Sequence, residues 1–202
     1  MRREMVETGR MMENKGLIVA AEGNISVRLG GHSFLVTPAG VSKGKLRVQD
    51  LLEVGDDGTS PQGTVTSEWP LHYNIYCQRP DLKAICHAHS PWSTAFAVAG
   101  RDLDGSLLTE TAQLLPRVPV APRSEPGTQA VAASVIPFIR DQDAVLLGNH
   151  GVVAAGTNLG AAFALLQTVE RLAQVTLLSE MAAGCCGLDE GTRQNLLDGL
   201  AR

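Results

Sequence analysis

Stretches with apolar residues at helical spacing alternate along this chain with short apolar runs that are typical of strands. The helical stretches predict helices over about residues 2–15, 66–81, 90–100, 127–141, 158–184 and 189–200. The short runs predict strands over about residues 25–28, 33–37, 50–59, 83–89, 117–122 and two more within 144–156. The order of these elements predicts a mixed α/β protein.

Individual residues mark several of the predicted boundaries. A Gly-Gly pair predicts a tight turn between the first two strands. Ser67 and Asn158 are candidate N-cap residues, and Gly184 is a candidate for the position just after the longest helix. Pro137 predicts that the helix containing it is interrupted or ends close to that residue.

The predicted elements fit one domain that spans residues 1–202, because a chain of this length can bury a single core. Their alternation predicts a central, mostly antiparallel sheet with helices on both faces. Hydrophobic residues make up 44% of the chain and charged residues 19%, a mixture that is ordinary for a globular protein.

The net charge of −4 argues against nucleic acid and an anionic membrane as partners, because no basic field is present to attract them. No apolar run approaches the roughly 20 residues of a membrane span. The N-terminus also lacks the apolar core of a secretory signal. The four cysteines show no CxxC pair or disulfide framework, which favours reduced thiols and a cytoplasmic location.

Candidate metal ligands occur at the end of the predicted strand over residues 83–89. Side chains two residues apart in a strand point to the same face, so His87 and His89 present two imidazoles side by side. His150 lies beside a glycine at another strand end, where backbone can approach a site closely. Three neutral imidazoles suit zinc and leave a coordination position open, as in catalytic sites. Each histidine alone also fits a structural role, so the prediction depends on their meeting in space.

Glu68 stands near the start of a predicted helix, behind Thr66 and Ser67. A carboxylate there is favoured by the helix dipole, so a capping charge is one interpretation. The other interpretation is a general base, because a zinc ion that polarises a carbonyl acidifies a neighbouring C–H or O–H bond. His72 lies one helical turn after Glu68 and fits helix packing or a supporting role beside the site.

Two glycine-containing stretches are typical of loops that bind anions. Residues 22–26 read EGNIS, and residues 37–40 read TPAG. Glycines allow backbone N–H groups to point at an oxyanion, and Asn24, Thr66 and Ser67 add side-chain donors. Each stretch also fits an ordinary turn, and the local sequence leaves both interpretations open.

Several short motifs follow one another in a fixed order: GNISVR, VTPAGVSK, TSEWPLHYNIYCQRPD, ICHAHSPW, VPVAP, PGT and GNHGVVAAG. Together they resemble the class II aldolase/adducin family, whose enzymes include L-fuculose-1-phosphate aldolase and L-ribulose-5-phosphate 4-epimerase. The resemblance runs from about Thr8 to Ala182, most of the chain. The ordered set is specific for the family and much less so for the substrate.

The resemblance implies a single-domain α/β/α fold that holds zinc, or another divalent metal, through His87, His89 and His150. It also implies that Glu68 is the acid/base residue beside the metal, and that the protein forms a homotetramer with active sites between subunits. In the aldolases of the family, the substrate phosphate is held by the residues that match Gly23, Asn24, Gly40, Thr66 and Ser67.

Two departures from the family's pattern bear on the substrate. Ala39 stands where the aldolases usually carry a hydroxyl residue, which removes one donor from the phosphate loop. The stretch over residues 105–119 lacks the tyrosine that the fuculose enzyme contributes as a catalytic acid, and Glu110 and Gln113 are candidates only by location. A further acidic residue and histidine of the epimerases also have no match, so epimerisation is less favoured.

The resemblance predicts a zinc-dependent aldolase, a lyase that cleaves or forms a C–C bond in a ketose phosphate or related hydroxy-carbonyl compound through a metal-stabilised enediolate. A sugar-phosphate dehydratase and a keto-acid decarboxylase on the same scaffold are alternatives, because both use a metal-bound enolate. A non-catalytic, adducin-like interaction module is less favoured, because the three histidines and the glutamate are all present. An esterase that uses Ser90 or Ser93 has no nucleophile elbow to support it.

Overall fold

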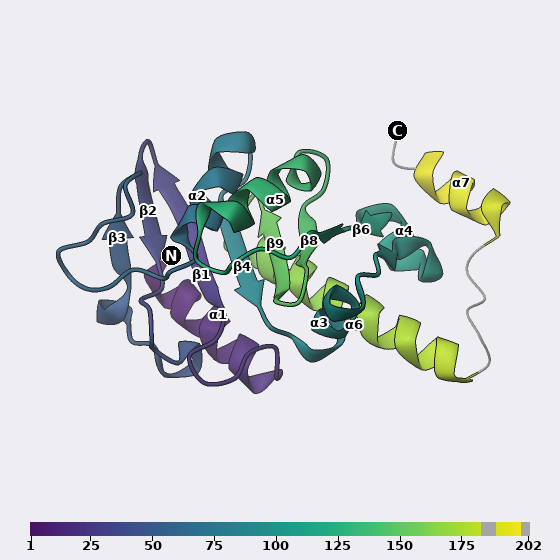
Figure 1. Ribbon diagram of the computed structural model, residues 1–202, viewed down its shortest axis with the longest axis horizontal. Helices are drawn as coiled ribbons and strands as arrows, with labels where there is room; N and C mark the ends of the chain where they lie inside the picture. Colours follow the sequence, from purple (N-terminus) through teal and green to yellow (C-terminus); the bar gives the residue numbers. More distant parts are fainter. Residues whose placement is uncertain (183–188, 199–202) are drawn as a thin grey trace.

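Antiparallel strand pairing organises the structure, a computed structural model that describes residues 1–182 and 189–198 (Figure 1). The strands of the central sheet are β1 (Asn24–Gly30), β2 (Ser33–Val36), β3 (Leu52–Val54), β4 (Ala84–Ala88), β7 (Val120–Ala121), β8 (Ala144–Leu147) and β9 (Gly151–Gly156). Their order is β3-β2-β1-β4-β9-β8-β7, and each neighbouring pair is antiparallel except β7–β8. The prediction of a mostly antiparallel sheet is therefore confirmed.

Helices cover both faces of this sheet, as the sequence predicts (Figure 1). One face packs against α1 (Arg2–Asn14), α3 (Pro91–Ala99) and α6 (Leu159–Ala182). The opposite face packs against α2 (Trp69–Gln78) and α5 (Gln129–Ile139). The sheet therefore separates two hydrophobic cores.

The side chains of β4 alternate between the two cores, and this alternation decides where the histidines lie. Cys86 packs in the core beneath α1, α3 and α6, whereas Ile85 packs in the core beneath α2 and α5. Because side chains alternate along a strand, His87 points to the same side as Ile85. Glu68 is the N-cap residue of α2, which covers that side, so both residues belong to one face of the sheet.

The predicted N-cap of α2 is wrong. The helix begins at Trp69, Glu68 is the N-cap residue, and no side chain caps this helix end. The Trp69 N–H donates to the Thr66 carbonyl at 3.1 Å. This turn occupies the backbone just before the helix, so Ser67 lies in the turn rather than at the cap.

The predicted strand over residues 117–122 is split in two. β6 (Arg117–Val118) pairs with β5 (Leu103–Asp104) in a separate small sheet, whereas β7 joins the central sheet beside β8. Pro119 lies between the two pieces and has no N–H to donate to a ladder. Its carbonyl accepts a hydrogen bond from the Leu146 N–H at 2.8 Å, which ties the break to β8.

Two helices also differ from the prediction. Helix α5 begins at Gln129 and ends at Ile139, two residues after Pro137, so it is shorter at both ends than predicted but ends close to the proline as expected. Helix α4 (Thr109–Leu114) is absent from the predicted elements, since six residues are too few to show a helical period.

Other predicted boundaries agree with the structure. The Asn158 side chain caps α6 by accepting a hydrogen bond from the Ala161 N–H at 2.8 Å. The last predicted helix is α7 (Glu190–Asp198), which lies beside α4. Gly184, predicted to follow α6, lies outside the described residues, as does the predicted end of the last helix at Leu200.

No described helix combines the length and the apolar character needed to cross a membrane. Within the described ranges, Cys77 is exposed and Cys86 is buried, and both are free thiols. Cys185 and Cys186 lie outside those ranges.

Ile85→Ala is expected to lower the free energy of unfolding by about 2–5 kcal/mol, because it leaves a cavity beneath α2 and α5. Ile85 is fully buried, whereas Val98 on α3 is 58% exposed and offers a matched control. Val98→Ala should change the same free energy by less than about 0.5 kcal/mol. Urea denaturation followed by circular dichroism measures both values, and equal effects would contradict the position of Ile85 in the core.

Candidate metal centre and active site

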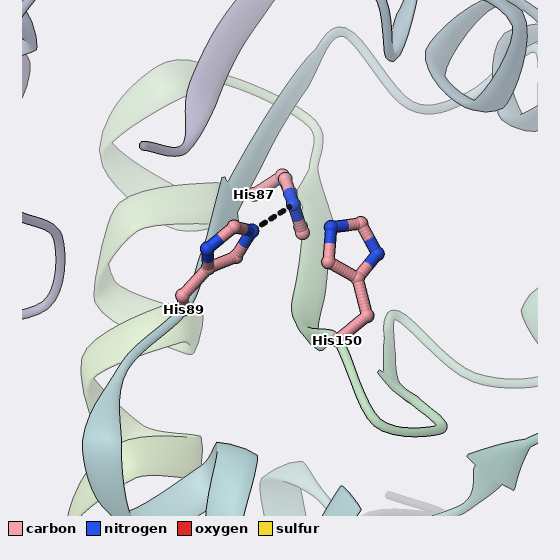
Figure 2. A group of neighbouring side chains, drawn as sticks. All are labelled: His87, His89 and His150. Atoms are coloured by element: carbon pink, nitrogen blue, oxygen red, sulfur yellow. Dashed lines mark hydrogen bonds between the residues drawn. The ribbon is translucent and has the colours of Figure 1, made fainter. Parts of the chain in front are cut away.

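Three imidazole rings gather at the ends of two neighbouring strands (Figure 2). His87 lies in β4, His89 follows the end of that strand, and His150 comes directly before β9. The ring centroid of His87 is 5.0 Å from that of His89 and 4.8 Å from that of His150, and the last two are 4.8 Å apart. Their candidate donor nitrogens all lie within 4.8 Å of one another, so the structure brings the three predicted ligands together.

Burial favours the neutral form of the His87 and His150 rings, which is the form that binds a metal. The pKa of His87 is held well below its ordinary value, mainly by burial and then by the neighbouring imidazoles. Burial likewise lowers the pKa of His150 to about 4. Because a carbonyl can only accept, the Nδ1–H of His87 donates to the Val152 carbonyl (3.0 Å), which leaves a lone pair on Nε2.

The turn between β8 and β9 fixes the position of His150. Asn149 has a left-handed backbone (φ 59°), which asparagine tolerates better than most residues. The His150 N–H donates to the Leu147 carbonyl at 2.9 Å and closes the turn. A Cβ on Gly151 would lie 2.4 Å from the Ala88 carbonyl oxygen, so glycine is needed where the two strands approach.

The distances fit a shared divalent ion. The Nε2 atoms of His87 and His89 are 3.2 Å apart. Two histidine nitrogens that bind a tetrahedral zinc ion at about 2.0–2.1 Å are themselves about 3.3 Å apart. Three neutral imidazoles are also a donor set that zinc and several other divalent ions accept. The residues present therefore fit a metal site with three protein ligands.

Glu68 is buried in the wall of the same cavity and is 6% exposed. Burial raises the pKa of its carboxyl group, and a hydrogen bond from the Gly127 backbone N–H partly opposes this shift. Its Oε2 atom is buried and has no hydrogen-bond partner among the described residues. The carboxyl group makes no helix cap and is free to exchange a proton with a molecule in the cavity.

A cavity of about 250 Å³ joins the histidines and Glu68 to the loops predicted to bind an anion. Its walls contain every residue that the sequence analysis assigns to phosphate binding: Gly23, Asn24, Gly40, Thr66 and Ser67. Ala39 also lines the cavity, at the position of the missing hydroxyl. The fold thus gathers segments that are far apart in the sequence around one space.

Strand pairing connects the three histidines to residues 22–26, the first of the two stretches predicted to bind an anion. Gly23 has φ +65°, and a Cβ there would lie 2.7 Å from the His87 carbonyl oxygen, so glycine is needed on both counts. Asn24 pairs with His87 in the ladder between β1 and β4. Asn24 is 4% exposed, and its Oδ1 atom has no partner in the described part of the chain. Asn24 therefore presents a buried, unused amide oxygen beside the histidines.

Hydrogen bonds also position the TPAG stretch and the segment that contains Thr66, both of which are predicted to bind the anion. The Ala39 N–H donates to the Thr64 carbonyl at 2.9 Å, and the Glu68 N–H donates to the Thr66 hydroxyl at 3.4 Å. The Ala39 amide is therefore engaged within the protein and is not an open donor for a ligand.

Two charged residues in the cavity wall, Glu22 and Lys43, are missing from the sequence-based site. The Oε1 atom of Glu22 lies 3.6 Å from the Nδ1 atom of His89, where a carboxylate can orient a metal-binding imidazole. The sequence signal for Glu22 is its position directly before Gly23, which is itself a predicted site residue. Lys43 follows the TPAG stretch closely, but no local pattern shows that its side chain turns inward.

His72 lies outside the group of possible ligands. It is fully buried, and its Nδ1 atom is 2.7 Å from the Ser26 hydroxyl, which is 2.8 Å from the Tyr76 hydroxyl. Burial lowers the pKa of His72 to about 3, so the ring is neutral. These contacts attach α2 to β1, in agreement with the helix-packing interpretation.

The remaining candidates also lie elsewhere. Glu110 and Gln113 are exposed, and Glu110 lines a separate cavity of about 620 Å³. The hydroxyls of Ser90 and Ser93 are 2.6 Å apart and hydrogen-bond to each other at the start of α3. Within one chain, none of these four residues lines the 250 Å³ cavity.

Comparison with known proteins identifies the family. Residues 3–177 match the family model described as the Class II Aldolase and Adducin N-terminal domain. The chain belongs to the class II aldolase and adducin family. The resemblance carried by the sequence motifs is therefore confirmed.

Relatives of this class II aldolase/adducin protein include two enzymes and a solved structure. The L-fuculose phosphate aldolase of Methanocaldococcus jannaschii is 32% identical over 179 residues, which cover 88% of this chain and 96% of that protein. The 3-oxo-tetronate 4-phosphate decarboxylase of Escherichia coli (strain K12) is 31% identical over 183 residues, which cover 88% of this chain and 86% of that protein. The crystal structure of L-fuculose-1-phosphate aldolase from Thermus thermophilus matches with a TM-score of 0.82 and 33% identity, covering 92% of this chain and 97% of that one.

These similarities agree with the sequence analysis on fold and on enzyme class. The α/β fold is that of the family, and the relatives support a metal-dependent aldolase. The decarboxylase alternative also has a relative of its own.

Alanine at position 87, 89 or 150 is expected to abolish tight binding of a divalent metal, since each variant leaves two imidazoles of the three (His87→Ala, His89→Ala, His150→Ala). Zinc loading, dialysis and elemental analysis should give about one zinc per wild-type chain. His32→Ala is the control, because the His32 side chain is 87% exposed and pairs with Asp56. Unchanged zinc content in His150→Ala would remove His150 from the ligand set.

Proposed function

We propose that this protein is a zinc-dependent aldolase that cleaves or forms a C–C bond in a ketose phosphate or a related hydroxy-carbonyl compound. The observation that carries this proposal is the meeting of three imidazoles and one buried carboxyl group in a single cavity, whose walls include the loops predicted to bind an anion. The aldolase names of two relatives support the same class of substrate.

His87, His89 and His150 would hold the metal, with zinc as the first choice for a site of three imidazoles. The bound cation supplies Lewis-acid catalysis by stabilising negative charge on the substrate oxygens. The His87–Val152 hydrogen bond keeps the His87 lone pair directed at the ligand position. The buried setting strengthens these electrostatic interactions, because it excludes most of the water.

Glu68 would move the proton. In cleavage, the Glu68 carboxylate would accept the proton of the hydroxyl that becomes the aldehyde carbonyl, the C–C bond would break with its electron pair left on the donor fragment, and Glu68 would pass the proton to that carbon. In synthesis, the carboxylate would remove the proton from the same carbon, and the oxygen of the new hydroxyl would receive it after the C–C bond forms. Burial raises the pKa of Glu68 and thereby eases its use as both acid and base.

Gly23, Asn24, Gly40, Thr66 and Ser67 would hold the substrate's phosphate at the other end of the cavity. The left-handed backbones of Gly23 (φ +65°) and Gly40 (φ +69°) suit loops whose amides surround an oxyanion. Fixing the phosphate sets the position of the reacting carbons relative to Glu68, which is an orientation effect.

Decarboxylation of a 3-keto acid phosphate is the second candidate, because one relative carries that name. Both reactions leave an electron pair on carbon next to a carbonyl, and Glu68 could protonate that carbon in either case. A sugar-phosphate dehydratase has no such support. A non-catalytic, adducin-like role is disfavoured by the intact site.

The proposal further includes a homotetramer of chains whose residues 1–202 form one domain, working in the cytoplasm. The resemblance supports the tetramer, and the free thiols of Cys77 and Cys86 are consistent with a reducing compartment. Light scattering after size-exclusion chromatography tests the tetramer directly.

Glu68→Gln is expected to reduce turnover by about 10²–10⁴-fold, because the amide cannot carry the proton. Zinc content should remain at the wild-type level, since the three histidines are untouched. Glu53→Gln is the control, because the Glu53 side chain is 52% exposed on β3, away from the cavity. Near wild-type turnover in Glu68→Gln would show that another group carries the proton.

A panel of ketose 1-phosphates and a 3-keto acid phosphate distinguishes the two candidate reactions. Release of dihydroxyacetone phosphate from a ketose phosphate is expected, and a chelator should abolish it until zinc is restored. Carbon dioxide release from the keto acid phosphate alone would favour the decarboxylase. Activity that survives complete metal removal would contradict both.

A further inference from the structure

Lys43 belongs to the wall of the 250 Å³ cavity, together with the anion-binding loops. Among the described residues that line this cavity, it is the one lysine or arginine. It begins the short 3₁₀ helix η1 (Lys43–Lys45) and is only 2% exposed. A long cationic side chain is seldom so completely buried unless something pairs with it.

Two backbone carbonyls hold the ammonium group in place. The Lys43 Nζ atom donates to the Ala21 carbonyl at 2.7 Å and to the Val41 carbonyl at 2.9 Å. These carbonyls belong to the segments that lead into the first anion loop and out of the second. An ammonium group has three N–H donors, so one donor stays available for a further acceptor.

No carboxylate in the described part of the chain forms an ion pair with Lys43. Glu13 of α1, which lies near the same 3₁₀ helix, instead accepts a hydrogen bond from the Ser42 hydroxyl at 2.6 Å. Burying a charge without an opposite charge is costly, and here burial lowers the pKa of Lys43 to about 8. At neutral pH the group still carries its proton, so the cavity holds a positive charge that an anionic ligand would balance.

Lys43 also lies where it can compensate for the hydroxyl donor that is missing at Ala39. The aldolases of the family usually place a hydroxyl at that position, and Ala39 offers none. The Ala39 backbone amide is already bonded to Thr64. Lys43 follows four residues later in the same segment and brings a charged donor to the same cavity. A charged hydrogen bond is stronger than the neutral one that the alanine removes.

We propose that Lys43 is the cationic anchor of the anion subsite and that its third N–H donates to the phosphate of the substrate. This inference rests on the proposed function in so far as the anion is part of the substrate. The residue binds and positions the phosphate ester, and it takes no part in proton transfer. The two carbonyl contacts orient the ammonium group.

Lys43→Met tests this role, and Lys45→Met is the matched control. Both variants remove one lysine from η1, but Lys45 is exposed and lines a different cavity. Calorimetric titration of the zinc-loaded proteins with inorganic phosphate should show binding that is roughly tenfold to a hundredfold weaker in Lys43→Met. Lys45→Met should differ from the wild type by less than about twofold. Equal phosphate affinity in all three proteins would overturn the proposal.

A second readout separates phosphate recognition from loop support. In aldol synthesis, Lys43→Met should lower kcat/KM for dihydroxyacetone phosphate through KM, with kcat changed little. With dihydroxyacetone, which has no phosphate, the loss of kcat/KM relative to the wild type should be much smaller. An equal loss with both donors would mean that Lys43 only supports the loops, and the proposal would be wrong.

One further measurement uses the wild-type protein, and the phosphate titration does not depend on aldolase activity. If Lys43→Met does not fold, wild-type protein with ¹³C-labelled lysine should show the Lys43 side-chain signals shifting as inorganic phosphate is added, while those of Lys45 stay in place. Static Lys43 signals at saturating phosphate would refute the anchor. If the wild-type protein has no aldolase activity, the proposed reaction fails, but the phosphate titration still decides the role of Lys43.

Discussion

The register between β1, β4 and β9 is the constraint on which the whole site depends. It sets Asn24 opposite His87 and His87 opposite Val153, so a predicted anion-binding residue, a predicted metal ligand and the strand after His150 lie in one row. Because side chains alternate with a period of two, a slip of one residue would turn His87 into the core beneath α1 and α6. The close approach of Gly151 to Ala88 admits no larger side chain and thereby helps to fix that register.

Burial shapes the chemistry that this register makes available. Around the cavity, Asn24 Oδ1, Glu68 Oε2 and His150 Nδ1 are buried without hydrogen-bond partners among the described residues. A metal ion and an oxygen-rich substrate would offer partners to these atoms. The same desolvation lowers the pKa values of His87 and His150 and raises the pKa of Glu68.

Much of the fold follows from the sequence because long periodic stretches and strong caps act locally. Helix α6, with its Asn158 cap, and the turn between β1 and β2 lie where the pattern predicts. The wrong predictions have both local and long-range causes. The Thr66–Trp69 turn places Glu68 rather than Ser67 at the N-cap of α2. Pro119 divides one predicted strand into β6, which pairs with β5, and β7, which pairs with β8. Short α4 has too few residues to show a period.

The sequence by itself determined the kinds of donor available and their local pairing: two histidines on one face of a strand, a third beside a glycine, and glycine-rich loops suited to an anion. The motif order also determined the family. Only the tertiary structure decided that these groups share one cavity, since strand order and crossing connections are long-range properties. It alone revealed Glu22 beside His89 and the inward course of Lys43, because whether a charged side chain is buried depends on what packs around it rather than on its neighbours in the chain.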